Sequence, residues 1–199
     1  MISAQDNEYV VLLDACVLVP MPLCDTLLRL AEEPAFYRPL WSEEILQEVG
    51  DALEKKLHRS PIQVRRRLAQ MREAFPEASV DVPADLIPAM VRIPDPNDRH
   101  VLAAAICGNA NAIITVNTRH FPAECLGQYG IEFQTPDEFL AYQFHLDPEQ
   151  ILEKLDGQSS NIGKDRRYII ERLRVMVPTF AALVEYGPKL KQEEGGGST

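Results

Sequence analysis

Two short apolar runs, each followed by a polar side chain, constrain the fold of this chain most strongly. Residues Tyr9–Leu13 precede Asp14, and residues 112–116 precede Asn117. A short run of apolar, largely β-branched residues is typical of a strand that is buried in a parallel sheet. Because open α/β sheets bind ligands at the carboxyl ends of their strands, Asp14 and Asn117 are predicted to lie in a binding crevice.

Periodic apolar residues and capping residues predict helices between and after these strands. Ser42 and Thr135 are typical N-cap residues, and Pro61 suits a first helical position. A further strand is expected at 131–133, and the proline-rich stretch 76–97 is expected to be mostly loop. The expected helices cover residues 23–31, 42–56, 61–71, 98–107, 135–144, 148–156 and 164–185.

This order of elements predicts a three-layer α/β/α sandwich with a mostly parallel central sheet over residues 1–145. A helical extension is expected at 146–190, with a linker rich in Gly, Ser and Asn between its two helices, and a flexible tail at 191–199. Apolar residues of the extension could dock a partner or a second copy of the chain, or pack against the domain's own core. These residues are Ile151, Leu152, Leu155, Ile169, Ile170, Leu173 and Val177.

The composition is that of an ordinary globular protein, with 46% hydrophobic and 25% charged residues. There is no run of about 18 apolar residues, and the first residues do not resemble a secretory signal. We therefore expect a cytoplasmic protein with no membrane span. The four cysteines have neither CxxC spacing nor a paired histidine, so they are expected to be reduced and mostly buried.

The net charge of −10 argues against a nucleic-acid partner, because most non-specific affinity for nucleic acid comes from neutralised phosphates. Two local features oppose this argument. Bound divalent cations would cancel several carboxylates, and basic residues are clustered at Lys55–Arg59 and Arg65–Arg67. Those two clusters either guide an RNA backbone or form solvated helix faces.

Side chains suited to a divalent metal occur at four places along the chain: Asp14, Glu48, the pair Asp95 and Asp98, and Asn117. Hard cations such as Mg²⁺ prefer oxygen ligands, usually one or two carboxylates together with water. A cation held in this way can activate a water molecule and stabilise the charge on a phosphodiester. The sheet is expected to bring these distant segments together.

Each of these residues also has a simpler explanation. Asp14 could merely end a strand, although a buried carboxylate is costly unless it is paired or metal-bound. Two glutamates in the first turn of the same helix compete with Glu48, but the helix dipole explains their position. Asp95 is explained as an N-cap, which leaves Asp98 as the candidate ligand of that pair.

Four segments, in the same order, resemble the motifs of PIN domains, and in particular those of bacterial VapC-type toxins. Together they lie within residues 9–140. They read Leu-Leu-Asp-Ala-Cys-Val-Leu from residue 12, Trp-Ser-Glu-Glu-Ile-Leu-Gln-Glu from residue 41, Asp-Pro-Asn-Asp-Arg-His-Val-Leu-Ala-Ala-Ala from residue 95, and Ile-Ile-Thr-Val-Asn-Thr-Arg-His-Phe-Pro from residue 113.

The resemblance implies a Mg²⁺- or Mn²⁺-dependent endoribonuclease whose RNA products carry a 5′-phosphate and a 3′-hydroxyl. Matching the motifs residue by residue implicates Asp14, Glu48, Asp98 and Asn117 as catalytic and metal-binding residues. The resemblance also implies the toxin of a type II toxin-antitoxin pair with a cognate antitoxin protein as its partner, and the apolar extension leaves a homodimer possible.

Asn117 departs from the commonest toxin pattern, which has Asp at this position. A neutral carbonyl oxygen lowers the charge at the second metal position, so we expect one tightly held ion, a second ion recruited with the substrate, or weak activity. One alternative is a weak or inactive PIN protein that acts as a binding module. A second alternative is a phosphatase-like hydrolase of the haloacid-dehalogenase kind, but Cys16 stands where that chemistry needs an Asp.

Three residues beside the motifs are candidate substrate contacts. Thr115 could hydrogen-bond a phosphate, although a threonine in a buried strand is as often structural. Arg99 and Arg119 could bind the RNA backbone. His100 and His120 are expected to be surface or helix-packed residues rather than general acids.

Overall fold

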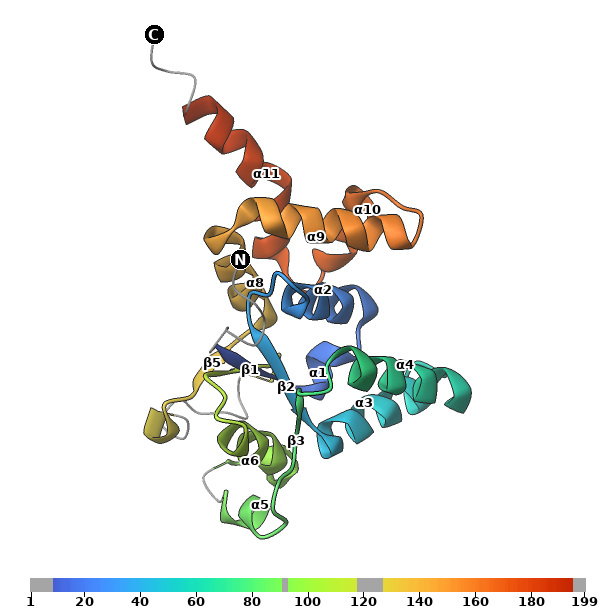
Figure 1. Cartoon of the computed structure of the whole chain (residues 1–199), viewed down its shortest axis with the longest axis vertical. Coiled ribbons are helices and arrows are strands. Elements are labelled where there is room, and N and C mark those ends of the chain that lie inside the picture. The colour runs from blue at the N-terminus through green and yellow to red at the C-terminus, as the bar shows by residue number, and fades with distance from the viewer. Residues whose placement is uncertain (1–8, 91–92, 118–126, 195–199) are drawn as a thin grey trace.

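The molecule is built around a sheet with helices on both sides of it, and the last helices are stacked beyond one of those sides (Figure 1). The structure is a computed structural model, and it describes residues 9–90, 93–117 and 127–194. The expected α/β sandwich with a C-terminal set of helices is confirmed.

Five parallel strands form the sheet. They are β1 (Val10–Leu13), β2 (Arg38–Ser42), β3 (Ser79–Val80), β4 (Ala112–Ile114) and β5 (Glu132–Gln134), in the spatial order β3-β2-β1-β4-β5. Central strand β1 is fully buried over its last three residues, and its Leu12 lies opposite Leu40 of β2 and Ile113 of β4. The strand order reverses between β1 and β4, and open α/β sheets place their binding crevice at such a switch point.

The helices before β4 are α1 (Ala15–Leu18), α2 (Met21–Ala31), α3 (Glu43–Lys55), α4 (Pro61–Ala74), α5 (Leu86–Ala89), the 3₁₀ helix η1 (Pro96–Asp98) and α6 (Arg99–Cys107). Those after β4 are the 3₁₀ helix η3 (Gly127–Tyr129), α8 (Pro136–Leu146), α9 (Pro148–Asn161), α10 (Arg166–Leu173) and α11 (Pro178–Glu194). Within the described parts of the chain, no helix is both long and apolar enough to cross a membrane.

The N-caps expected from the sequence are formed. The Ser42 hydroxyl accepts a hydrogen bond of 3.2 Å from the backbone N–H of Ile45 at the start of α3. Thr135 accepts one of 3.2 Å from Glu138, whose carboxylate in turn accepts one of 2.9 Å from the Thr135 backbone. These bonds satisfy N–H groups that have no partner within the helix, so they set where α3 and α8 begin.

Strand β2 was not predicted from the sequence. Pro39 lies within it and cannot donate a ladder hydrogen bond, which hides the strand pattern. In the sheet Pro39 is paired with Val11, and the buried side chains Leu40 and Trp41 hold the strand in place. Packing therefore overrides the local preference here.

The C-terminal region differs from the expectation in three ways. Helix α9 continues through Gly157 to Asn161, where a linker was expected, because the buried Gln158 side chain binds Thr26 Oγ1 and the Pro22 carbonyl of α2. The single helix expected at 164–185 is two helices, since Pro178 starts a new one. Helix α11 also reaches Glu194, so it includes residues 191–194 of the predicted tail.

The apolar residues of the C-terminal helices pack inside the chain. Ile151 and Leu155 of α9, and Leu173 after them, are at most 1% exposed and belong to the same core as the sheet. The Lys154 ammonium also donates 2.8 Å hydrogen bonds to the carbonyls of Arg29 and Glu32 at the end of α2. Of the two alternatives for this apolar face, packing against the chain's own core is the one observed.

Two glycines test how tightly the sheet and helices pack. A Cβ atom at Gly108, which ends α6, would lie 2.1 Å from Leu40 Cδ2, whereas one at Gly157 would meet only Arg29 Nη1 at 3.8 Å. We expect Gly108→Ala to lower the free energy of unfolding by about 1–3 kcal/mol through overpacking. Gly157→Ala should raise it by about 0.5–1 kcal/mol, since α9 gains a better helix former. Urea denaturation measures both, and a stabilising effect of Gly108→Ala would contradict this packing.

Candidate active site

The four predicted site residues reach one cavity from four separate segments. Asp14 directly follows β1, Glu48 is on α3, Asp98 ends η1, and Asn117 lies three residues beyond β4. All four line a cavity of about 610 Å³ at the switch point of the sheet. The other lining residues are Ala15, Cys16, Val19, Pro20, Asp51, Ala52, Lys55 and Lys56.

Asp14 is the buried member of this set, with 4% of its surface exposed. The Thr115 hydroxyl donates a 2.5 Å hydrogen bond to Asp14 Oδ2, and the Cys16 thiol donates one of 3.0 Å to the same oxygen. The Asn117 backbone N–H then donates to Thr115 Oγ1 at 3.0 Å. Burial of the carboxylate is thus compensated on Oδ2, and no hydrogen bond from the described residues reaches Oδ1.

Cys16 is a site residue that the sequence analysis did not single out. Its thiol also lies 3.2 Å from Thr115 Oγ1 and accepts a 3.3 Å hydrogen bond from the Val116 backbone. Burial, followed by the charge of Asp14, raises the pKa of Cys16 to about 12, so the thiol is a neutral donor. Cys16 could have been identified from its position two residues after the Asp that ends β1. The turn from that Asp into α1 brings Cys16 back beside the end of the strand.

Glu48 is the exposed member of the set, with 45% of its side chain accessible. Its Oε2 lies 3.6 Å from Nε2 of His100, a distance of ion pairing rather than of hydrogen bonding. Burial lowers the pKa of His100, but the nearby Glu48 and Glu44 outweigh burial and leave that pKa raised. His100 is therefore a buried, helix-packed residue, as expected, and His120 lies outside the described residues.

Two of the acidic residues that competed for these roles, Glu43 and Asp95, are occupied elsewhere. Glu43 accepts hydrogen bonds of 3.0 Å and 2.6 Å from the Arg72 guanidinium, which lowers the pKa of Glu43. Asp95 accepts a 2.9 Å hydrogen bond from the Asn97 backbone and so acts as the expected cap. Neither residue lines the cavity, whereas Glu48 and Asp98 do.

The residues predicted to contact the substrate do not line the cavity, as far as they are described. Thr115 is fully buried and its hydroxyl is bound to Asp14, so we expect it to act through Asp14. Arg99 does not line the cavity, and its Nε donates a long 3.5 Å hydrogen bond to the Ile93 carbonyl. Arg119 lies outside the described residues. Lys55 and Lys56 line the cavity instead, at the C-terminal end of α3.

The donor set of the cavity fits Mg²⁺ or Mn²⁺. Carboxylate and amide oxygens are the ligands that these hard cations take, and Asp14 Oδ1 is left for such an interaction. Over the described residues, however, no three His, Cys, Asp or Glu side chains converge closely enough to form a ready-made metal site. Asp14, Glu48 and Asp98 are the carboxylates that would hold such a cation, with Asn117 as a neutral ligand.

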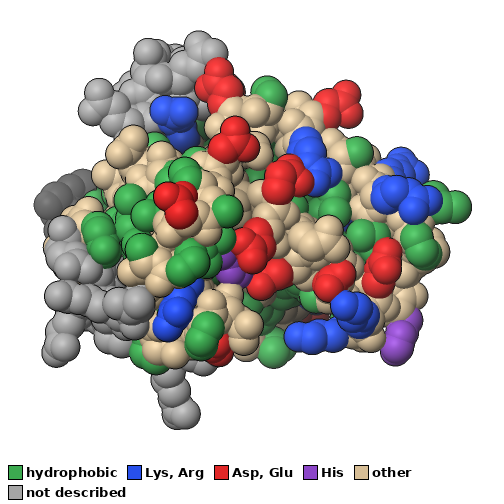
Figure 2. Space-filling view, turned by 90° about the horizontal axis from the view of Figure 1, so that it is seen from below, with side chains coloured by type: hydrophobic (Ala, Val, Ile, Leu, Met, Phe, Trp, Pro, Cys, Tyr) green, Lys and Arg blue, Asp and Glu red, His purple; other side chains and the backbone are tan. Residues whose placement is uncertain are grey.

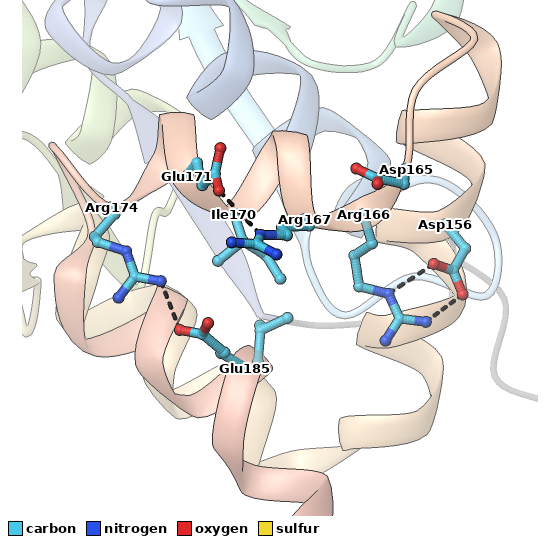
Figure 3. A pocket seen from close by; sticks show the side chains of 9 residues that line it. Asp156, Asp165, Arg166, Arg167, Ile170, Glu171, Arg174 and Glu185 are labelled. Carbon is cyan, nitrogen blue, oxygen red and sulfur yellow. Dashed lines mark hydrogen bonds and ion pairs between the residues drawn. The ribbon is translucent and has the colours of Figure 1, made fainter.

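A second large cavity, of about 630 Å³, lies among α9, α10 and α11 (Figure 3). Its arginines are each held by a carboxylate: Arg166 by Asp156, Arg167 by Glu171 at 3.1 Å, and Arg174 by Glu185 at 2.6 Å. These pairs neutralise one another, so no unpaired charge is left to recruit an anion. The candidate active site is therefore the cavity at the switch point.

A family model described as PIN domain matches residues 10–119, which contain all four predicted site residues. The chain belongs to the PIN-domain family. A curated protein named "Putative ribonuclease VapC50", from Mycobacterium tuberculosis (strain ATCC 25618 / H37Rv), is 46% identical to this chain over 89 residues. Those residues are 43% of this chain and 52% of that protein, so the match spans about half of the relative's length.

The bond between Thr115 and Asp14 makes the PIN domain's site testable without any substrate. We expect Thr115→Val to lower the free energy of unfolding by about 1.5–3 kcal/mol, because a buried carboxylate loses a charge-assisted hydrogen bond. Thr115→Ser keeps the hydroxyl and should cost only about 0.8 kcal/mol for the lost methyl group. Urea denaturation in the presence of a chelator gives both values, and equal losses would mean that the hydrogen bond contributes nothing.

Proposed function

We propose that this PIN protein is a Mg²⁺- or Mn²⁺-dependent endoribonuclease and the toxin of a toxin-antitoxin pair. The observation that carries the proposal is the shared cavity of Asp14, Glu48, Asp98 and Asn117, which come from four distant segments. The cavity that these oxygen donors line is at the switch point, where α/β folds bind their ligands. The name of the mycobacterial relative supports the ribonuclease activity.

Each residue has a distinct part in the proposed reaction. When bound, the cation supplies charge stabilisation for the phosphodiester and a water molecule of lowered pKa. Asp14 offers Oδ1 from a side chain that Thr115 and Cys16 hold in one orientation. Glu48 and Asp98 add carboxylate oxygens from two other elements, and Asn117 adds a neutral amide. Hydrolysis needs no covalent bond to the protein.

RNA is the proposed substrate, although the net charge is −10. Lys55 and Lys56 place cationic side chains on the rim of the acidic cavity. Lys55 is bound to Asp51 at 2.7 Å, whereas Lys56 has no ion pair among the described residues. An unpaired cation beside the carboxylates can contact the phosphate backbone and lower its repulsion from the acidic residues.

Asn117 favours a second candidate function, a weak or inactive PIN protein that acts as a binding module. An Asn contributes no charge to a cation, so the cavity relies on Asp14, Glu48 and Asp98 for neutralisation. The acidic side chains are also not gathered around one point in the described structure. A protein that neither binds metal nor cleaves RNA would support this candidate.

The partners proposed for the chain follow from its likeness to VapC-type toxins. They are a cognate antitoxin protein and a second copy of the chain. The proposed place of action on RNA is the cytoplasm. Ile151, Leu155 and Leu173 are already buried within the chain, so these residues are not offered as the antitoxin surface.

Two neighbouring aspartates provide a matched test of the nuclease proposal. We expect Asp98→Asn to lower the cleavage rate of a mixed RNA pool in Mn²⁺ or Mg²⁺ by more than about 100-fold, since even outer-shell changes cost 10–100-fold. Asp95→Asn removes the same charge three residues away, and Asn is an equally good cap. Its rate should stay close to that of the wild type.

The controls separate activity from folding and from metal binding. Thermal unfolding checks that both variants are folded, a chelator control checks the need for metal, and calorimetry measures Mn²⁺ binding. Equal losses of activity in the two variants would argue against a direct role of Asp98. A wild-type protein that binds no Mn²⁺ and cuts no RNA would move the assignment to the binding module.

A further inference from the structure

A smaller cavity, of about 170 Å³, adjoins the candidate active site. Residues that line the two cavities are neighbours in the chain: Pro20 lines the acidic cavity and Met21 the smaller one, and Ala52 and Leu53 are divided in the same way. The link between α1 and α2 and the second half of α3 therefore separate the two cavities. The remaining residues of the smaller cavity are Arg59, Gln63, Val64 and Arg67.

The lining of this cavity is apolar at the bottom and polar at the rim. Leu53 and Val64 are 2% and 4% exposed, and Met21 is 52% exposed and adds a polarisable thioether. Ligand pockets are usually about 300–1,000 Å³, so a cavity of 170 Å³ suits one ring system rather than a whole ligand. Apolar faces with polar edges are the features of a nucleobase.

The polar groups at the rim are fixed in place. Gln63 Oε1 accepts a 3.0 Å hydrogen bond from the Ser60 backbone in the capping box of α4, which leaves the amide N–H₂ group to donate. The Arg67 guanidinium is bound to the carbonyls of Leu18 and Val19, at 3.2 Å for Val19. Both side chains are thus ordered without a ligand, which reduces the entropic cost of binding one.

Positive charge without a partner lies between the two cavities. Arg59, at the rim of the smaller cavity, and Lys56, at the rim of the acidic one, have no ion pair among the described residues. Figure 2 shows Lys and Arg side chains gathered toward the side of the molecule where α3 and α4 lie in Figure 1. In a chain of net charge −10, two unpaired cations here favour a phosphate between the cavities.

We propose that the smaller cavity is a subsite for one nucleotide of the RNA substrate, next to the phosphodiester in the acidic cavity. The base lies against Met21 and Leu53, Gln63 donates to an acceptor on the base edge, and Lys56 and Arg59 bind the adjoining phosphate. This subsite rests on the proposed nuclease function, since it needs RNA in the acidic cavity. It gives the protein a preference for the base at one position beside the cut.

The first test compares two arginines that differ in place but not in charge. Arg59 lines the subsite, whereas Arg65 is exposed on α4, lines neither cavity and has no ion pair among the described residues. Fluorescence anisotropy with a labelled single-stranded oligoribonucleotide, in chelator so that no cleavage occurs, gives the Kd of each variant. We expect Arg59→Gln to raise Kd by about 10-fold, as for one good nucleotide contact, and Arg65→Gln to raise it less than threefold.

The second test asks for the base itself. A set of oligoribonucleotides in which one abasic nucleotide is moved along the sequence should show one position that weakens wild-type binding most. Met21→Ala, at a half-exposed side chain with little effect on folding, should weaken binding to the intact RNA. For the RNA that is abasic at that position, Met21→Ala and the wild type should have the same Kd. That RNA lacks the base that Met21 would contact, so removing the Met21 side chain loses nothing more.

The outcomes distinguish this proposal from the nuclease proposal. Equal effects of Arg59→Gln and Arg65→Gln, or a Met21→Ala effect that ignores the abasic position, would overturn the subsite even if RNA is cut. A selective loss with Arg59→Gln in a wild type that binds RNA but cuts none would support the subsite and reject the nuclease. A wild type that binds no RNA in chelator and cuts none in Mn²⁺ or Mg²⁺ would overturn both.

Discussion

The hydrogen bond from the Thr115 hydroxyl to Asp14 Oδ2 joins the segments that follow β1 and β4 across the switch point of the sheet. A buried carboxylate costs several kcal/mol unless donors replace its water, and here Thr115 and Cys16 do so on one oxygen. The neutral Cys16 thiol is needed for this, because a thiolate would repel the carboxylate. Asp14 is therefore held rigidly with its other oxygen available, and the rest of the candidate site is arranged around it.

Acidic and basic groups are separated over a short distance along α3 and the loop that follows it. Glu48 and Asp51 of α3 line the acidic cavity, Lys56 caps the end of α3 at the same cavity, and Arg59 lines the adjoining cavity from the loop before α4. The net charge of −10 is thus a poor guide to this surface, since a phosphate responds to charges within about one Debye length, roughly 8–10 Å in physiological salt. A cation bound between the carboxylates would offset the negative charge that remains in the acidic cavity.

The helices beyond β5 stabilise the sheet domain from one side. Lys154 satisfies the carbonyls at the end of α2, and Gln158 bonds to Thr26 within the same helix. Helix α2 begins at Met21, where the two cavities adjoin, so these contacts also fix the wall between the cavities. The ion pairs of Arg166 with Asp156 and of Arg174 with Glu185 also lie in this region, but they are exposed and add little to its stability.

The sequence by itself determined the α/β class, central strand β1 with Asp14 at its end, the caps of α3 and α8, and the four motif residues, because these depend on local periodicity and on spacing along the chain. Only the tertiary structure decided that β2 is a strand despite Pro39, and that α9 continues through Gly157. It also decided that Cys16 supports Asp14 and that the basic rim adjoins the acidic cavity. Each of these features depends on contacts between segments far apart in sequence. The packing energy of such contacts exceeds the local preference, and they produce no periodic pattern in the sequence from which they could be predicted.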